Sequence, residues 1–179
     1  MARISLDRVR ALPDIISTTE FELILGNIPN WGQDRDLIVK CQQAVYPGTG
    51  NEAYEVPLAG YSMYFRGRKT YPRQLSLTFV EDRFLKTTNA FNNWLEYIVG
   101  TNSGTSAAYK RGADSGYSLD DVQLLTYDPT GHKIDTVHFF GVFPQDKPDV
   151  QYDGSSSQLY SVSVTLVYDY YTSDLTEVR

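Results

Sequence analysis

The sequence predicts a mainly β fold of the α+β class, an antiparallel β-sandwich or partial barrel with one packed α-helix. Several segments alternate apolar and polar residues with a period of two, most clearly over 74–80 and 160–170. Helical periodicity is confined to one stretch, over 81–100. Fourteen of the 179 residues are tyrosine, which is favoured in strands and at interfaces. Without an internal repeat, this length predicts a single domain over residues 1–179.

The N-terminal part predicts two strands. Residues 1–19 predict either a short helix, broken at Pro13, or an arm that orders against a neighbouring molecule. EFELIL (20–25) alternates as a half-buried strand and is stopped by GNIPNWG. DLIVKCQQAVY (36–46) repeats the alternation with Leu37, Val39 and Cys41, and so predicts a second strand over 37–45.

The middle of the chain predicts a turn-rich connection, a basic loop and a strand. Residues 47–60 are punctuated by glycine and proline and predict turns. The basic loop that follows is the candidate inter-subunit loop, formed by Arg66, Arg68, Lys69 and Arg73. QLSLTFV (74–80) then predicts a strand with Leu75, Leu77 and Phe79 on its apolar face.

The helix is predicted within 81–100 from apolar residues at positions i, i+3, i+4 and i+7. Thr87 or Thr88 is the expected N-cap, and Gly100 the expected stop. The apolar stripe is interpreted as core packing and consists of Phe91, Trp94, Leu95 and Ile98.

The C-terminal part predicts a loop, a hairpin and a long strand. Residues 101–118 are rich in Gly, Ser and Ala and predict a long loop. Residues 121–144 predict a hairpin that turns at Asp128–Gly131. After a polar connection, residues 159–171 alternate over their whole length and predict one long strand.

Composition argues against several classes of protein. The formal net charge of −6 and the pI of about 4.8 disfavour sequence-specific binding to nucleic acid. Cys41 is the single cysteine, which excludes an intrachain disulfide and a thiol metal cluster. The N-terminus lacks an apolar signal region, and no apolar run approaches the roughly 20 residues of a membrane span. We expect a soluble protein, made in a cytoplasm and not bound to membrane.

No catalytic constellation is present in the sequence, so no enzyme activity, cofactor or metal is predicted. His132 and His138 lack a third ligand, and no phosphate-cradling or nucleophile motif occurs. Asp128-x-Thr130-x-His132 resembles a calcium loop only faintly, because its glycine is misplaced and its acidic twelfth position is absent. An enzyme whose site is assembled from distant residues is the remaining catalytic alternative.

The polar faces of two predicted strands are small and uncharged, whereas a solvent-exposed strand normally carries Lys and Glu. Such a face, opposite an apolar face packed on a helix, suits the wall of a water-filled channel. Copies in a ring would close such a wall and remove its edges. The candidate lumen face is Gln74, Ser76, Thr78, Ser161, Ser163 and Thr165.

Two blocks resemble the tail tube protein family of contractile-tailed bacteriophages, which is related in fold to type VI secretion tube proteins. The first is EVPLAGYSMYFRGRKTYPRQLSLTFVEDRFLKTTNAFNNWLEYIVG, with a Val-Pro-x-x-Gly segment, basic loop, strand, Glu81-Asp82 step and helix in the family's order. The second is IDTVHFFGVFPQDKPDVQYDGSSSQLYSVSVTLVYDYY, similar to the family's C-terminal half. The N-terminal segment and the 101–118 loop fit the family less clearly.

The resemblance implies a tail-tube-like domain whose hexameric rings stack into a hollow tube. Four strands per copy would give a barrel of about 24 strands, wide enough for DNA to pass during genome ejection without specific binding. It also implies sheath, baseplate and tape measure proteins as partners, and a location in the virion after assembly in the cytoplasm of the host bacterium. The basic loop would then contact a neighbouring copy.

Several alternatives remain open from the sequence. A baseplate tube-initiator or a type VI-like secretion tube ring would share the same pattern. A carbohydrate-binding β-sandwich is favoured by the tyrosine and tryptophan content. For the basic loop, the alternative is a solvated surface loop without a partner.

Overall fold

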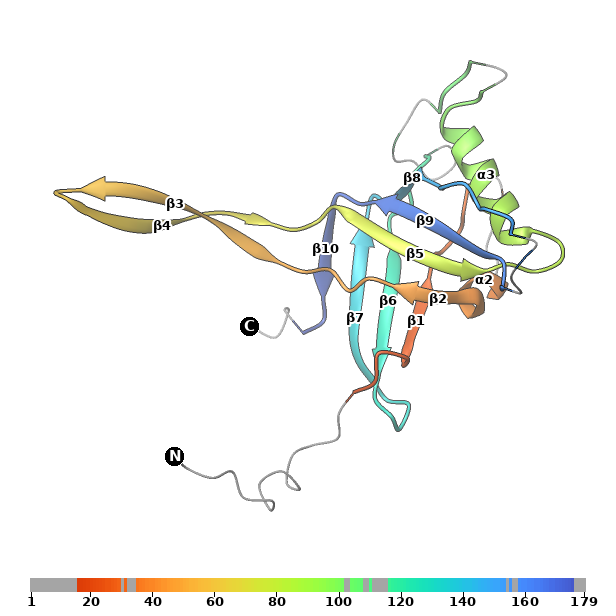
Figure 1. Cartoon of the computed structure of the whole chain (residues 1–179), viewed down its shortest axis with the longest axis horizontal. Helices are drawn as coiled ribbons and strands as arrows, with labels where there is room; N and C mark the ends of the chain where they lie inside the picture. Colours follow the sequence, from red (N-terminus) through yellow and green to blue (C-terminus); the bar gives the residue numbers. More distant parts are fainter. Residues whose placement is uncertain are drawn as a thin grey trace.

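In the part of the chain that it describes, the computed structural model contains two four-stranded sheets, a long two-stranded hairpin and two helices (Figure 1). The structure describes residues 16–29, 31, 35–101, 104–107, 110, 116–153, 155 and 158–175. All strand pairs within the named sheets are antiparallel, which confirms the predicted mainly β class. In the described part of the chain the two sheets remain open, so the architecture is the predicted sandwich rather than a closed barrel.

The first sheet has the strand order β1-β6-β7-β10. Its strands are β1 (Phe21–Ile24), β6 (Val122–Tyr127), β7 (Lys133–Phe140) and β10 (Tyr170–Ser173). The hairpin between β6 and β7 turns where the sequence predicts. There the carboxylate of Asp128 accepts hydrogen bonds from the amides of Thr130 (2.9 Å) and His132 (2.8 Å), so the acid organises a turn.

The second sheet has the order β2-β5-β9-β8 and lies across the first (Figure 1). Its strands are β2 (Cys41–Ala44), β5 (Gln74–Val80), β9 (Ser161–Val167) and β8 (Phe143–Asp146). β5 has the predicted bounds. The central strands β5 and β9 bury alternate residues against the first sheet, namely Leu75, Leu77, Phe79, Val162, Val164 and Leu166.

Helix α3 (Lys86–Ile98) covers one end of the sandwich. Phe91 and Trp94 of the predicted stripe are fully buried, and the rings of Phe91 and Phe79 lie 5.5 Å apart between centroids. Ile98 is partly buried against the same core, while Leu95 is only half-buried. The Nε1–H of Trp94 donates to the carbonyl of Tyr117 at 2.7 Å, which joins the helix to the segment before β6.

The predicted N-cap of this helix is wrong. The N-cap is Leu85, in the left-handed conformation with φ of 52° and without a capping side chain. The carboxylate of Glu81 takes that role, accepting from the amides of Thr87 (3.1 Å) and Thr88 (2.8 Å) and from the Thr88 hydroxyl (2.7 Å). Capping by a residue six positions away leaves no local sequence signature. The helix ends at Ile98, two residues before the predicted stop.

We expect Glu81→Gln to lower the free energy of unfolding by about 1–2 kcal/mol at pH 7. Burial would raise the pKa of Glu81, but hydrogen bonds from Thr88 and Thr87 outweigh it and hold that pKa below its usual value. The stabilisation from a depressed carboxyl pKa is present above the unfolded-state pKa and is lost as pH falls through the folded-state value. The difference between wild type and Glu81→Gln should therefore shrink below about pH 4.

Urea unfolding at pH 7 and pH 3 measures this effect. Glu20→Gln, at an exposed carboxylate, is the matched control and should change little at either pH. An equal loss for Glu81→Gln at both pH values would contradict the capping role.

The predicted strand over 37–45 is wrong in its first half. Residues Arg35–Lys40 form helix α2, and β2 begins only at Cys41. Leu37 is buried in the core while Val39 is 86% exposed, so these residues do not share a face as strand alternation would require. Lys40, at the end of α2, forms an ion pair with Asp82 at 2.7 Å.

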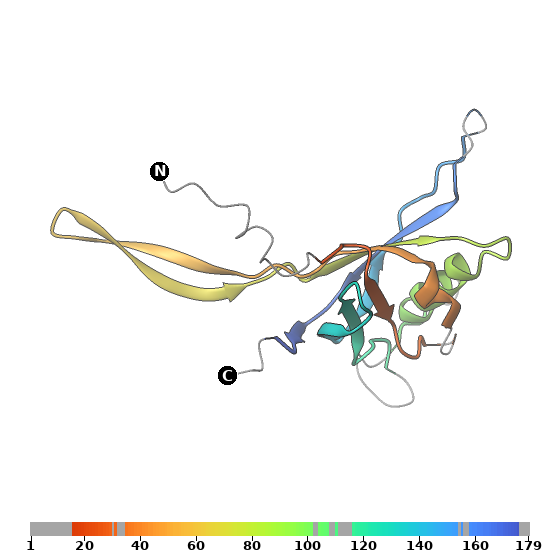
Figure 2. The same ribbon diagram turned by 90° about the horizontal axis from the view of Figure 1, so that it is seen from below.

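The predicted turns and basic loop are wrong over residues 50–58 and 61–70. Residues Gly50–Leu58 form β3 and Tyr61–Thr70 form β4, which pair as a long hairpin projecting from the body (Figures 1 and 2). Its turn is Ala59-Gly60, with φ values of 50° and 86°, as a two-residue hairpin turn requires. Gly60 thus lies in a turn, as the sequence predicts, whereas Gly50 and Pro57 lie within β3, where no core restricts them.

The predicted long strand over 159–171 is divided between the two sheets. β9 ends at Val167, and β10 begins at Tyr170 in the other sheet. The period of two holds only as far as Tyr168, because beyond the break Tyr171 packs against the core and Tyr170 is exposed. The predicted helix or arm over 1–19 lies outside the described residues up to residue 15. The predicted 101–118 loop is described only in part, including a bridge between Val99 and Ser106.

Candidate assembly surfaces

The structure brings the six residues of the candidate lumen face together on one side of β5 and β9. In the register of these strands, Ser76 lies opposite Thr165 and Thr78 opposite Ser163. The hydroxyls of Thr78 and Ser163 are 3.4 Å apart. We call this exposed side of the second sheet the polar face. It lies opposite the apolar side that forms the core.

The two edge strands continue the polar face. Gln43 of β2 lies opposite Thr78, and the side chain of Gln145 in β8 accepts from that of Gln74 at 3.1 Å. Asp146 is the one charged residue within the printed bounds of these four strands. Val80 and Val167 lie on the same side, opposite Ser161 and Gln74. The polar face therefore offers mainly hydroxyl and amide groups and almost no charge, so it has little means of holding a phosphate backbone.

The β3–β4 hairpin carries an apolar side that has no core beneath it. Three cross-strand pairs form what we call the apolar hairpin face: Tyr54–Phe65, Val56–Met63 and Leu58–Tyr61. The aromatic rings of Tyr54 and Phe65 stack at 6.5 Å between centroids. Five of these six side chains are exposed, and Val56 is half-buried. A contiguous apolar ribbon in water is characteristic of a surface that binds protein.

Three of the basic residues lie in β4 and Arg73 lies directly before β5; most of them are engaged within the chain. Arg68 pairs with Glu52 across the hairpin at 3.0 Å. Lys69 lies over the ring of Tyr171 and Arg73 over that of Tyr71, each 5.8 Å from the ring centroid. Among the described residues Arg66 forms no ion pair, so it is the cation of this group that can bind a partner.

A glycine allows the close approach of the two hairpin strands beside the Arg68–Glu52 pair. The pairing register shifts between Asn51 and Ala53, which marks a β-bulge. A Cβ atom placed on Gly67 would lie 2.8 Å from the Cβ and 2.9 Å from the carbonyl oxygen of Glu52. Any side chain at residue 67 would therefore force the strands apart.

An aromatic cluster at the hairpin root, which sequence analysis did not identify, fixes the hairpin to the body. Tyr168 stacks with Tyr71 at 6.3 Å and meets Phe139 and Tyr171 edge-on at 5.0 and 6.1 Å between centroids. The hydroxyl of Tyr71 donates to the carbonyl of Asp169 at 3.1 Å, and that of Tyr168 donates to the carbonyl of Pro72. Burial raises the pKa of Tyr168 to about 12. The dense tyrosines at 168–171 are the sequence signal for this cluster.

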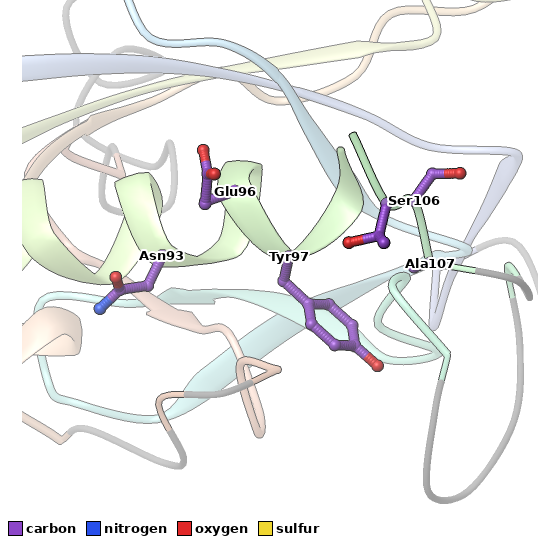
Figure 3. Close-up of a pocket in the computed structure, with 6 residues that line it drawn as sticks. Asn93, Glu96, Tyr97, Ser106 and Ala107 are labelled. Carbon is purple, nitrogen blue, oxygen red and sulfur yellow. The ribbon is translucent and has the colours of Figure 1, made fainter. Parts of the chain in front are cut away.

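Among the described residues, the pocket beside α3 and the two histidines form no catalytic constellation. A pocket of about 530 Å³ beside α3 is open and polar, lined by Asn93, Glu96, Tyr97, Thr105, Ser106 and Ala107 (Figure 3). His138 contacts Asp121 at 2.9 Å, and His132 contacts the hydroxyl of Thr130 at 2.7 Å. Within the described ranges, no group of three or more potential ligands among His, Cys, Asp and Glu is placed to hold a metal ion. In the same ranges, no helix has the length and apolarity needed to cross a membrane.

Comparison with known proteins gives one family and a set of similar folds. The family described as phage tail tube protein matches residues 12–174. No curated protein matches the chain.

Three solved structures illustrate the similarity of fold. A chain of the anti-feeding prophage cap, a tube-terminating cap, is 16% identical over 92% of this chain and 93% of that chain, with a TM-score of 0.64. A chain of the sheath-tube complex of an extracellular contractile injection system in its extended state is 12% identical over 96% of this chain and 99% of that chain, with a TM-score of 0.55. A type six secretion system protein is 11% identical over 87% of this chain and 83% of that chain, with a TM-score of 0.50.

Proposed function

The chain belongs to the phage tail tube protein family and is thus a structural subunit of a tube rather than an enzyme; on that premise we propose that six copies form a ring and that rings stack into a conduit for DNA. DNA then passes through the conduit during genome ejection without being bound in a sequence-specific way. The finished tube is part of a virion or phage-like particle, assembled in the cytoplasm of a bacterial host.

The polar face is the observation that carries this proposal. The second sheet contributes four strands, so six copies would supply about 24 strands to a closed barrel. With strands about 4.8 Å apart and tilted by about 40°, the backbone diameter is on the order of 50 Å, which admits a DNA duplex. A wall of hydroxyl and amide groups in a subunit of net charge −6 repels phosphate weakly and does not bind it, so DNA can slide.

Ring closure also explains the exposed edges of the second sheet. Among the described residues, its edge strands β2 and β8 each pair with a strand on one side only. Pairing of these edges between neighbouring copies would satisfy their backbone groups and remove a site of unspecific aggregation.

We propose that the hairpin contacts another copy and that its apolar face supplies most of that contact. Arg66, which lies on the opposite side of the hairpin beside Tyr64 and Glu55, adds an ion pair with a carboxylate of the neighbouring copy. Arg68, Lys69 and Arg73 instead stabilise the hairpin and its root. The sheath, baseplate and tape measure proteins are the further partners of the assembled tube.

Electron microscopy of the purified protein tests the proposal. We expect rings or tubes with a central channel, formed either spontaneously or on addition of a tube-initiating partner. Dispersed monomers under both conditions would contradict it. Rings that never stack, even with such a partner, would favour the alternative of a baseplate tube-initiator.

Reversing the charge of Arg66 should weaken assembly. We expect Arg66→Glu to reduce the amount of tube about 5- to 30-fold, equivalent to about 1–2 kcal/mol, because a rim ion pair becomes a repulsive contact. Sedimentation measures the polymerised fraction, and circular dichroism checks the fold. Arg83→Glu, at an exposed arginine before α3, is the matched control for the change in net charge. Equal effects of the two variants would show that only total charge matters.

A further inference from the structure

A second exposed apolar surface lies between β1 and the end of β2. It is a groove of about 480 Å³, and Ile16, Val45 and Tyr46 are about half exposed along it. Its lining is predominantly apolar, in contrast to the polar pocket beside α3. We call it the β1–β2 groove and define it by Ile16, Phe21, Ala44, Val45, Tyr46 and Leu124.

We propose that the β1–β2 groove receives the apolar hairpin face of a second copy of this chain. The inference rests on the proposed tube function and names the receiving site for the hairpin. Tyr61 and Met63, near the hairpin tip, are the residues we place in the groove.

The groove cannot be filled by the hairpin of its own chain. The hairpin continues the direction of β2 and β5 and points away from the body (Figures 1 and 2). The aromatic cluster around Tyr168 and the Lys69–Tyr171 contact hold its root against the first sheet. With nine residues in β3, the hairpin is about 30 Å long, so its tip is far from the groove of the same molecule. A hairpin that fills this groove therefore comes from another copy.

The two surfaces are chemically complementary. Each hairpin tip presents adjacent aromatic, thioether and branched apolar side chains, and the thioether of Met63 adapts to irregular apolar surfaces. The groove presents branched and aromatic side chains together with three hydroxyl side chains and the Glu20 carboxylate, and its lining includes no basic residue. Docking the apolar hairpin face into the β1–β2 groove removes from water two apolar surfaces that the single chain leaves exposed.

The contact joins two different surfaces and is therefore heterologous. Such a contact closes into a ring if the rotation between copies allows it; otherwise it leaves hairpins and grooves unoccupied at opposite ends of the assembly, where further copies can add. The geometry thus accounts for a structure that grows by addition of copies. Because Val45 directly precedes the hairpin of its own chain, each docking event would also contact the start of the next hairpin.

Disulfide trapping tests the pairing. Cys41 is first replaced by Ser, although burial raises the pKa of its thiol to about 11 and already makes it slow to react. Chains with Val45→Cys and chains with Met63→Cys are then mixed, assembled and oxidised. We expect a disulfide-linked dimer from the mixture and none from either chain alone. The matched control replaces Val45→Cys by Val39→Cys, since Val39 is a more exposed valine outside the groove.

Electron microscopy of the same samples separates the two hypotheses. Absence of tubes in the wild type would defeat the proposed function itself. Tubes without a Val45–Met63 disulfide, or with as much disulfide from the Val39 control, would overturn the docking site while leaving the tube function intact.

A second pair of variants covers the case in which cysteine impairs assembly. Val45→Glu should reduce tube formation at least tenfold, whereas Val39→Glu should leave it within twofold of wild type. Equal effects would overturn the inference. A Val45→Cys chain that forms its disulfide with a cysteine placed in residues 1–15 would also overturn it, because the groove would then hold the N-terminal segment.

Discussion

Replacing Tyr61 and Met63 together by Asp should abolish tube formation while leaving the body of the protein folded. Both side chains are exposed on the apolar hairpin face, and neither contributes to the core. In an assembled tube they would be buried, and two unpaired carboxylates in an apolar contact cost several kcal/mol. Since each 1.4 kcal/mol changes an association constant tenfold, assembly should fall by more than a hundredfold.

Two measurements distinguish this result from simple misfolding. The free energy of unfolding in urea should change by less than about 0.5 kcal/mol, as for other surface substitutions. The control, Ser62→Asp with Tyr64→Asp, adds the same charge on the opposite side of the same strand and should reduce assembly far less. Tubes of normal length from the first variant would show that the apolar hairpin face is not an assembly surface.

Trp94→Ala should have the largest effect on stability, lowering the free energy of unfolding by about 3–5 kcal/mol. Trp94 is fully buried, stacks on Phe91 at 6.2 Å between centroids and donates its Nε1–H to Tyr117. Truncation leaves a cavity between α3 and the sheets and also an unsatisfied carbonyl. The free energy of unfolding of such a domain is about 5–15 kcal/mol in total, so a large share of the stability would be lost.

Trp94→Phe separates packing from hydrogen bonding. It retains an aromatic ring but cannot donate to Tyr117, and we expect a loss of about 1–3 kcal/mol. Chemical denaturation followed by circular dichroism measures both variants. A loss below about 1 kcal/mol for Trp94→Ala would mean that α3 is not part of the cooperative core.

Elements packed on the core could be predicted from the sequence because burial imposes a period. β5, the β6–β7 hairpin and α3 each bury one side, and their apolar residues repeat accordingly. The β3–β4 hairpin has no core on either side, so its pattern reads as a series of turns and charges. Helix α2 has six residues, too few to show helical periodicity against the adjoining strand.

The candidate surfaces were predictable to different degrees. Alternation placed Ser76 and Ser163 each on the polar side of its strand, and the pairing of β5 with β9 joined those sides. The partners of the basic residues depend on contacts between distant segments, such as Lys69 with Tyr171, which no local pattern contains. The β1–β2 groove, where Ile16 approaches Val45, is likewise a product of the tertiary fold.

The hairpin and the polar face belong to the same pair of chain segments. β2 leads into β3, and β4 leads into β5, so the strands that form the projecting ribbon continue into the second sheet (Figure 1). In the tube that we propose, tension arriving at a hairpin tip would pass along covalent backbone directly into the second sheet, the proposed wall of the channel. A conduit built in this way resists stretching through its peptide chain, and side-chain contacts are strained only where one copy meets the next.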